Sequence, residues 1–179
     1  MGTTIPAEGA SESEFESIFL EHYPRVLAML TRLTGDRAQA EDLASDVFWR
    51  LSRRPIDWLL TNNVGAWLYR TATHAGIDAL RAAERRKRRE QEAKAEGREN
   101  ETALTEVLRD ETCRGVRSVL ASMKAAQAQL LLMRADGCSY RELAQALTVA
   151  PASIGTLLNR AEAEFRKRYL KATRKKERV

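Results

Sequence analysis

The sequence is poor in cysteine and histidine, with two of each, and it has no long apolar run. Its only two cysteines, Cys113 and Cys138, form no CxxC motif, which argues against a disulfide framework or a zinc site and predicts a reduced, cytoplasmic protein. No apolar run approaches the ~20 residues needed to cross a bilayer. Residues 1–13 lack the charged-then-apolar order of a signal peptide and are expected to form a disordered leader. We therefore expect no membrane insertion, no metal and no cofactor.

The sequence also lacks the patterns of β-strands and of a catalytic site. No stretch keeps a period-two alternation, so the fold is predicted to be all-α. The two histidines, His22 and His74, are far apart and have no evident metal-binding neighbour. The adjacent carboxylates Glu41 and Asp42 face different sides of a predicted helix, which makes them a poor acid–base pair. These features predict a protein that is not an enzyme.

Positive charge is concentrated in two zones, although the net charge is only +5. Residues 61–94 carry a net charge of +4 and residues 139–179 carry +6, whereas residues 1–60 carry −4. Two contacts with one polyanion would explain this distribution. Two unrelated solvated surfaces would explain it too.

One long helix is predicted from Ala66 to Arg89. Its expected packing face is narrow and consists of Leu68, Ala72, Ala75 and Ala79. The opposite face carries Trp67, Arg70, His74, Asp78, Arg81, Arg85 and Arg88. Cations can meet phosphates while aromatic rings stack on unpaired bases, so this face suits nucleic acid. A solvated charged face is the alternative that the helix alone leaves open.

Two helices are predicted before it. The first begins near Glu14, is expected to kink or divide at Pro24, and ends at Gly35. The second, from Arg37 to Arg53, starts at the cap residue Asp36. Its buried residues are expected to be Ala40, Leu43, Ala44, Val47 and Leu51, and its outward residues Asp42, Asp46, Trp49 and Arg53. An exposed tryptophan indicates a partner, unless Trp49 packs under a neighbouring segment. Residues 54–64 are expected to form a loop or a short helical turn.

Residues 90–103 are charged and read as a flexible tether, and a second helical domain follows. Ser139 and Glu142 form a capping box before a short helix, Tyr140–Leu147, whose expected buried residues are Leu143, Ala144 and Leu147. Pro151 is placed in the first turn of the last helix. This is the helix-turn-helix arrangement, although a simple helical hairpin has similar spacing. The outward residues would be Ser153, Gly155, Thr156, Asn159 and Arg160, followed by a basic tail that includes Lys167.

Three stretches together resemble a known family. They are GDRAQAEDLASDVFWRL (35–51), AWLYRTATHAGIDALRAAERR (66–86) and SYRELAQALTVAPASIGTLLNRAEAEF (139–165). In this order and spacing the chain resembles an extracytoplasmic-function (ECF, group 4) sigma factor, a compact bacterial transcription initiation factor. The resemblance implies two small helical domains: residues 14–89 (sigma domain 2), a linker of residues 90–103, and residues 104–179 (sigma domain 4).

The resemblance implies partners and roles. The partners are core RNA polymerase (the clamp helices of its largest subunit and the flap of the second-largest), promoter DNA and an anti-sigma factor. The residues implied to bind polymerase are Asp42, Asp46, Trp49, Arg50 and Arg53. Those implied to bind the minus-ten element are Trp58, Asn62, Asn63, Trp67, Arg70, His74, Arg81, Arg85 and Arg88. Those implied to bind the minus-thirty-five element are Ser139, Tyr140, Arg141, Ser153, Thr156, Asn159, Arg160 and Lys167.

Several positions depart from the family pattern. Ser45 stands where glutamine is usual, His74 where asparagine is usual, and Thr148 where glycine is preferred. The recognition helix has Gly155, Thr156, Leu157 and Asn159 where lysine, arginine and serine are typical, and Leu157 is expected to point outward. Two other hypotheses therefore remain open: a sigma-like accessory protein that recognises DNA poorly, and a helix-turn-helix regulator that acts without polymerase as its direct partner.

Overall fold

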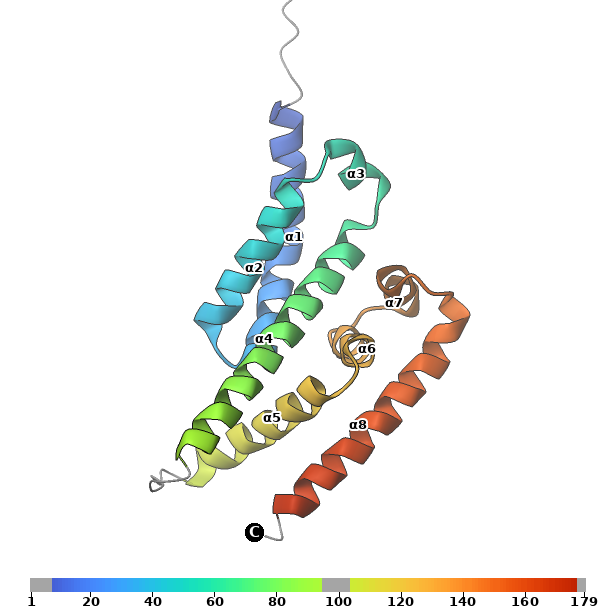
Figure 1. The fold of residues 1–179 in the computed structure, drawn as a ribbon. Coiled ribbons are helices and arrows are strands. Elements are labelled where there is room, and N and C mark those ends of the chain that lie inside the picture. Colours follow the sequence, from blue (N-terminus) through green and yellow to red (C-terminus); the bar gives the residue numbers. More distant parts are fainter. Residues whose placement is uncertain (1–7, 95–103, 177–179) are drawn as a thin grey trace, which may run out of the picture.

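The computed structural model describes residues 8–94 and 104–176, and within them it contains helices and no strand. The N-terminal group consists of α1 (Glu8–Thr34), α2 (Arg37–Ser52), α3 (Ile56–Thr61) and α4 (Val64–Lys94). The C-terminal group consists of α5 (Leu104–Ser122), α6 (Ala125–Ala135), α7 (Tyr140–Leu147), the 3-10 turn η1 (Pro151–Ser153) and α8 (Ile154–Lys176). The predicted all-α fold with two helical groups is confirmed (Figure 1).

The beginning of the chain is more helical than expected. Helix α1 starts at Glu8, inside the segment expected to be a disordered leader, and it runs through Pro24 without dividing there. Proline removes one helical hydrogen bond, but residues on both sides of it are anchored in one core. Phe19 packs edge-on against Phe48 of α2 at 5.0 Å between ring centroids, and Val26 is fully buried. Tertiary packing therefore holds the two halves of α1 in line.

The predicted helix ends around α2 and α7 are confirmed. Gly35 follows α1 with a φ of +74°, and the side chain of Asp36 accepts a hydrogen bond from the backbone of Gln39. Ser139 and Glu142 form the capping box at the start of α7. Pro151 opens the 3-10 turn η1 instead of the first turn of α8. Helices α7 and α8 form the predicted helix-turn-helix (Figure 1).

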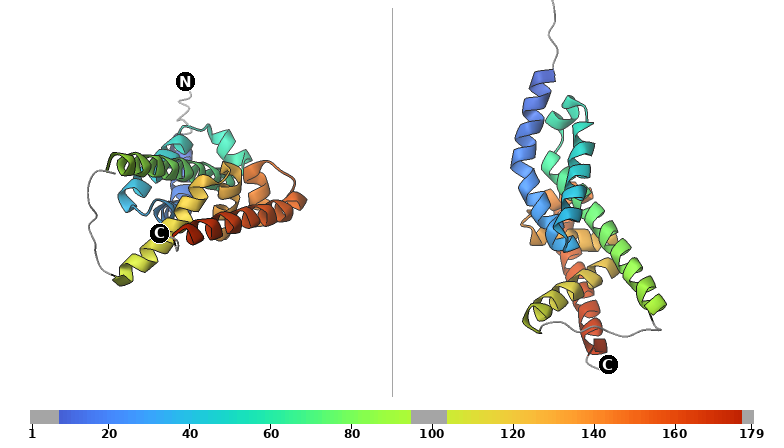
Figure 2. Two further views of the ribbon diagram at one scale, coloured as in Figure 1. Left: turned by 60° about the horizontal axis from the view of Figure 1, so that its bottom comes forward. Right: turned by 90° about the vertical axis from the view of Figure 1, so that its left-hand side faces the viewer.

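Helix α4 is buried on two sides because the C-terminal group packs against it (Figure 2). It contacts α1 and α2 on one side and α5, α6 and α7 on the other. Ala75 and Ala79, expected in a narrow packing face, are only half-buried, whereas Ile77 and Leu80 are buried against Val119. A periodicity argument for one amphipathic face cannot reveal a second partner surface.

Helix α1 approaches α4 closely at Gly76. A Cβ atom on Gly76 would lie 2.5 Å from Cδ2 of Leu33 and 3.1 Å from Cδ2 of Leu30. Both leucines are buried in α1. The absence of a side chain at Gly76 thus allows α1 and α4 to pack closely, and Leu68 and Ala72 of the predicted packing face are fully buried as expected.

Thr148, the residue after α7, is held in an unfavourable backbone conformation. Its φ of 57° and ψ of 47° are left-handed, and it is the one non-glycine residue with a positive φ in the described part of the chain. Because its side chain is exposed, Thr148→Gly should raise the free energy of unfolding by about 1 kcal/mol. Urea denaturation measures this change.

The matched control for this prediction is Thr148→Ala. Alanine keeps the Cβ atom that disfavours the left-handed region, so this variant should gain much less stability than the glycine variant. Equal stability of the glycine and threonine proteins would contradict strain at this turn.

Candidate nucleic-acid and polymerase interface

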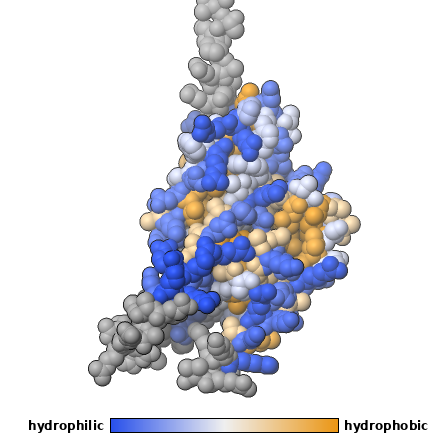
Figure 3. Space-filling model, in the orientation of Figure 1, coloured by the Kyte–Doolittle hydropathy of each residue, from blue (hydrophilic) through white to orange (hydrophobic). Residues whose placement is uncertain are grey.

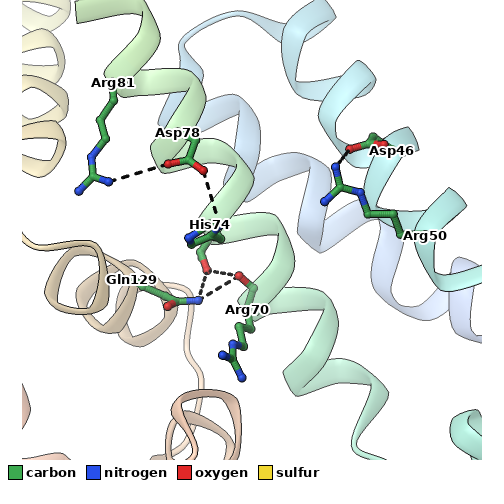
Figure 4. Close-up of polar contacts among 8 residues, drawn as sticks. Asp46, Arg50, Arg70, His74, Asp78, Arg81 and Gln129 are labelled. Carbon is green, nitrogen blue, oxygen red and sulfur yellow. Dashed lines mark hydrogen bonds and ion pairs between the residues drawn. The ribbon is translucent and has the colours of Figure 1, made fainter. Parts of the chain in front are cut away.

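The outer face of α2 presents an exposed tryptophan among charged side chains. Trp49 is 58% exposed, and the guanidinium of Arg53 lies 4.7 Å from its ring centroid. Nη2 of Arg50 donates a hydrogen bond to Oδ2 of Asp46 at 2.6 Å (Figure 4). Asp42 is exposed on the same helix. The residues predicted for polymerase binding thus share one accessible helix, and we call Asp42, Asp46, Trp49, Arg50 and Arg53 the α2 face.

The segment between α2 and α4 folds into α3 and an aromatic cluster. Trp58 of α3 and Trp67 of α4 meet edge-to-face, with 5.6 Å between their ring centroids. The guanidinium of Arg54 lies 4.9 Å from one ring centroid and 5.3 Å from the other. The sequence did not predict a role for Arg54. Its only distinguishing feature there is its place after Ser52 and Arg53 and before Pro55. The cation fixes both rings beside the start of α4.

A hollow of about 320 Å³ lies beside these rings. Its lining residues are Trp58, Thr61, Asn62, Asn63, Ala66, Trp67, Arg70, Gln145 and Ala146. Five of the residues predicted for the minus-ten element therefore come together here. Gln145 and Ala146 belong to α7, so the C-terminal group forms part of the wall.

The two asparagines of this hollow also have local structural roles. Nδ2 of Asn62 donates to the carbonyl oxygen of Trp58 at 2.9 Å and so closes the end of α3. Oδ1 of Asn63 accepts a hydrogen bond from the backbone N–H of Ala66 at 2.8 Å, which caps α4. Nδ2 of Asn63 donates to Oε1 of Gln145 at 2.6 Å. Capping uses Oδ1 and Gln145 accepts from Nδ2, so one N–H of the Asn63 amide remains as a donor towards a ligand.

On the polar face of α4, His74 is exposed to solvent, whereas Arg81, two turns further along, points towards α5. Nδ1 of His74 lies 3.6 Å from Oδ2 of Asp78, and both side chains are more than half exposed (Figure 4). The predicted nucleic-acid face required Arg81 to point into solvent, but it does not. It donates to the carbonyl oxygens of Ala121 and Met123 at 3.2 and 2.9 Å.

The rest of this stripe remains accessible. Arg70 at the beginning of α4 is exposed, as are Arg85 and Arg88 near its end. The structure thus separates Arg81 from the other predicted phosphate-binding arginines, because α5 lies against the middle of the helix.

The helix-turn-helix presents few cations. The residues predicted for the minus-thirty-five element are all exposed: Ser139, Tyr140, Arg141, Ser153, Thr156, Asn159, Arg160 and Lys167. Leu157 does not point outward as expected; it is half-buried and packs against the core. Figure 3 shows a hydrophobic area over α7 and the beginning of α8; Val149, which lies between them, is 37% exposed.

Two of these candidate residues are already engaged. Oγ of Ser139 donates to Oε2 of Glu142 at 2.6 Å, and this hydrogen bond, with one from the Ser139 backbone, lowers the pKa of the Glu142 carboxyl. The guanidinium of Arg134 lies 5.7 Å from the ring centroid of Tyr140. Both residues hold the start of α7 in place.

Burial affects the titration of two ionisable side chains, Cys138 and Tyr69. Burial raises the pKa of the Cys138 thiol to about 11 and that of the Tyr69 hydroxyl to about 12, which keeps both protonated at neutral pH. In the described ranges, no cluster of three or more histidine, cysteine or acidic residues could hold a metal ion. None of the helices described is both long and apolar enough to span a membrane.

Comparison with known proteins matches both helical groups to one family. The family profile "Sigma-70 region 2" matches residues 18–86, and "Sigma-70, region 4" matches residues 114–165. "RNA polymerase sigma factor YlaC" of Bacillus subtilis (strain 168) is 28% identical over 170 residues, which are 92% of this chain and 96% of that protein.

A solved structure is also similar. It is the co-crystal structure of the sigma factor RpoE with the anti-sigma factor NepR from Bartonella quintana. The TM-score is 0.52 at 21% identity, covering 88% of this chain and 96% of that chain. At this identity the similarity concerns the fold.

Proposed function

The chain belongs to the sigma-70 family of RNA polymerase sigma factors, with the two-region organisation of the ECF type, and on this premise we propose how it works. It is an alternative sigma factor that directs transcription initiation. The observation that carries this conclusion is the match of both regions, in order, to the two helical groups. In our proposal its own side chains perform no catalysis; they bind polymerase and select DNA in the cytoplasm.

The α2 face is the proposed docking surface for the clamp helices of the largest polymerase subunit. A large aromatic ring surrounded by charges of both signs is typical of a binding hot spot with a polar rim. Trp49 would supply the apolar anchor, while Asp46 and Arg53 would supply directional ion pairs. The solvent exposure of these side chains supports this assignment.

The hollow beside Trp58 and Trp67 is the proposed receptor for an unpaired base of the minus-ten element. Proteins that bind a flipped base stack it against aromatic side chains and read its edge with hydrogen bonds. Asn62, Asn63 and Arg70 supply polar groups to the same hollow. His74, one turn further along α4, is exposed and could contact the next nucleotide, while Arg85 and Arg88 would hold upstream phosphates.

We propose that the chain binds the minus-thirty-five element more weakly than the minus-ten element. Ser153, Thr156 and Asn159 are uncharged, and Arg160 is the one cation among the residues of η1 and the first two turns of α8. Good bidentate contacts to a base contribute about 1–3 kcal/mol each, so few of them are available here. This observation favours, as the second candidate, an accessory sigma factor that depends little on this element.

An apolar groove in the C-terminal group is the proposed site for the polymerase flap. It has a volume of about 560 Å³ and lies between α5, α6 and α8, where Leu120, Leu131 and Phe165 line it. An anti-sigma factor remains a proposed partner as well. The similar fold of a sigma factor crystallised with its anti-sigma factor supports this proposal.

Copurification tests the polymerase assignment. The tagged chain, added to a bacterial extract or to purified core RNA polymerase, should retain the core enzyme stoichiometrically at physiological salt. A helix-turn-helix regulator without polymerase as its partner would not retain it. Failure with the purified core enzyme would therefore overturn the proposed function.

A further inference from the structure

The recognition helix presents an uncharged stripe on the side opposite its core. The stripe begins in η1 and continues on α8, and we call it the reading stripe; its exposed residues are Ala152, Thr156, Asn159 and Ala163. At about 100° per residue, its members on α8 lie within about 60° of one another. The buried residues Ile154, Leu158 and Ala161 lie on the other side of the helix.

We propose that the reading stripe selects A·T base pairs in the minus-thirty-five element, because its methyl groups pack against the methyl groups of thymine. The inference rests on the function proposed above and adds the class of DNA sequence that this site binds. The chemistry of the stripe, its spacing and the charges beside it carry the inference.

The chemistry of the stripe matches thymine. Ala152, Thr156 and Ala163 each carry a methyl group on an exposed side chain. Thymine presents a methyl group at C5 in the major groove, and alanine and threonine methyl groups are its usual apolar partners. The usual partners of guanine are arginine and lysine, and the reading stripe contains neither. The stripe therefore favours thymine over guanine.

Asn159 supplies an amide within the same stripe. An asparagine amide can donate to N7 or accept from the N6 amino group of adenine, and it makes both contacts at once. Asn159 follows Thr156 by three residues, a rise of about 4.5 Å along the helix. Successive bases of one strand are about 3.4 Å apart. Thr156 and Asn159 can therefore contact neighbouring base pairs, one through a thymine methyl group and the other through an adenine edge.

The cations of α8 lie beside the stripe. Arg160 and Lys167 are exposed along one edge of it, and Arg166 is exposed along the other. Contacts with phosphates fix the position of a helix on DNA without reading the sequence. In the major groove, the base edges lie between two phosphate backbones, which matches an uncharged stripe between two positive edges. With a net charge of +6 over residues 139–179, a polyanion is the favoured occupant.

The surface next to the stripe is also apolar. The ring of Tyr140 at the start of α7 is 47% exposed. A Cβ atom on Gly155 would lie 3.9 Å from Cε2 of this ring, so the glycine leaves the ring uncovered. Figure 3 shows the hydrophobic area over α7 and the beginning of α8. Apolar contact is thus the main interaction that this end of α8 offers to a groove.

Deoxyuridine tests the contact, because it differs from thymidine only by the missing C5 methyl group. A promoter fragment identified by run-off transcription is resynthesised with deoxyuridine in place of thymidine on both strands of the minus-thirty-five element. The affinity of the holoenzyme should fall about fourfold for each thymine methyl group that the stripe covers. The same replacement in the spacer between the two promoter elements is the control and should leave the affinity unchanged.

Thr156→Ser makes the matching change in the protein, since serine lacks the methyl group and keeps the hydroxyl. This variant should bind the thymidine promoter about fourfold more weakly. Deoxyuridine should then weaken its binding less than that of the unaltered chain, because one contact has already been lost. The matched control is Thr173→Ser. Thr173 is exposed on the same helix outside the stripe, and its hydroxyl donates to the carbonyl oxygen of Tyr169 at 3.0 Å.

Several results would overturn the inference. They are an affinity that deoxyuridine in the minus-thirty-five element does not change, an equal loss from deoxyuridine in the spacer, and a set of promoters whose minus-thirty-five elements lack A·T pairs. A full deoxyuridine effect in Thr156→Ser would overturn it as well. Weaker binding of core polymerase without DNA by Thr156→Ser would make the stripe a protein contact instead.

Transcription separates this inference from the proposed function. If the chain initiates at specific promoters and deoxyuridine has no effect, only the inference is wrong. If the chain initiates on no fragment, the proposed function is wrong, and the inference fails with it.

Discussion

Asp46→Arg should lower the affinity for core RNA polymerase about 30-fold or more. The substitution places a second cation next to Arg50, one helical turn away, and removes the carboxylate that Arg50 now contacts at 2.6 Å. It also puts a positive charge at the position where, in our proposal, polymerase binds the carboxylate of Asp46. Losses of at least about 2 kcal/mol are typical of hot spots, which corresponds to this factor. Titration of labelled protein with core enzyme measures it.

The same helix supplies a closely matched control. Glu41 forms an ion pair with Arg37 at 2.8 Å, with the same spacing of four residues, and lies outside the α2 face. Glu41→Arg therefore has the same change in charge and the same broken pair, yet should retain polymerase affinity within about threefold. If both variants lose the same affinity for polymerase, the loss is an effect of net charge alone. If Asp46→Arg loses none, the docking surface lies elsewhere.

Replacing Arg85 and Arg88 with alanine should flatten the salt dependence of promoter binding by the holoenzyme. Each lost phosphate contact lowers the slope of log affinity against log salt by about 0.9 on duplex DNA, so the pair should lower it by about 2. Both side chains are exposed in the last part of α4. Adding Arg81→Ala should flatten the slope little further, because Arg81 is bonded to the carbonyl oxygens of Ala121 and Met123.

Arg37→Ala combined with Lys124→Ala removes two exposed cations elsewhere and should leave the slope unchanged. A slope that stays the same in the Arg85/Arg88 variant would mean that this end of α4 is merely solvated. A slope that changes equally in the control would indicate a nonspecific effect of net charge.

Local sequence signals predicted the ends of the helices well. Gly35, Asp36 and the Ser139–Glu142 capping box lie where expected, because each acts through the backbone within a few residues. The strained turn at Thr148 was predicted from the family resemblance, because the family prefers glycine at this position and a threonine with a positive φ is strained. These features do not depend on distant parts of the chain.

The predictions were wrong where contacts between segments distant in the sequence determine the conformation of a residue. Pro24 does not interrupt α1, because the aromatic core holds both halves. Leu157 is turned into the core, and Arg81 towards α5. The pairing of Asp136 with Arg25 and Arg32 crosses more than a hundred residues of sequence, and no local periodicity reports such a contact.

Run-off transcription with purified core RNA polymerase on fragments of the source genome tests the central claim most directly. The account predicts that adding this chain yields discrete transcripts with fixed start sites on a subset of fragments, and that core enzyme alone yields none of them. It further predicts that Asp46→Arg abolishes these transcripts while Glu41→Arg preserves them. The absence of specific initiation on every fragment, with the chain folded and bound to core enzyme, would contradict the account.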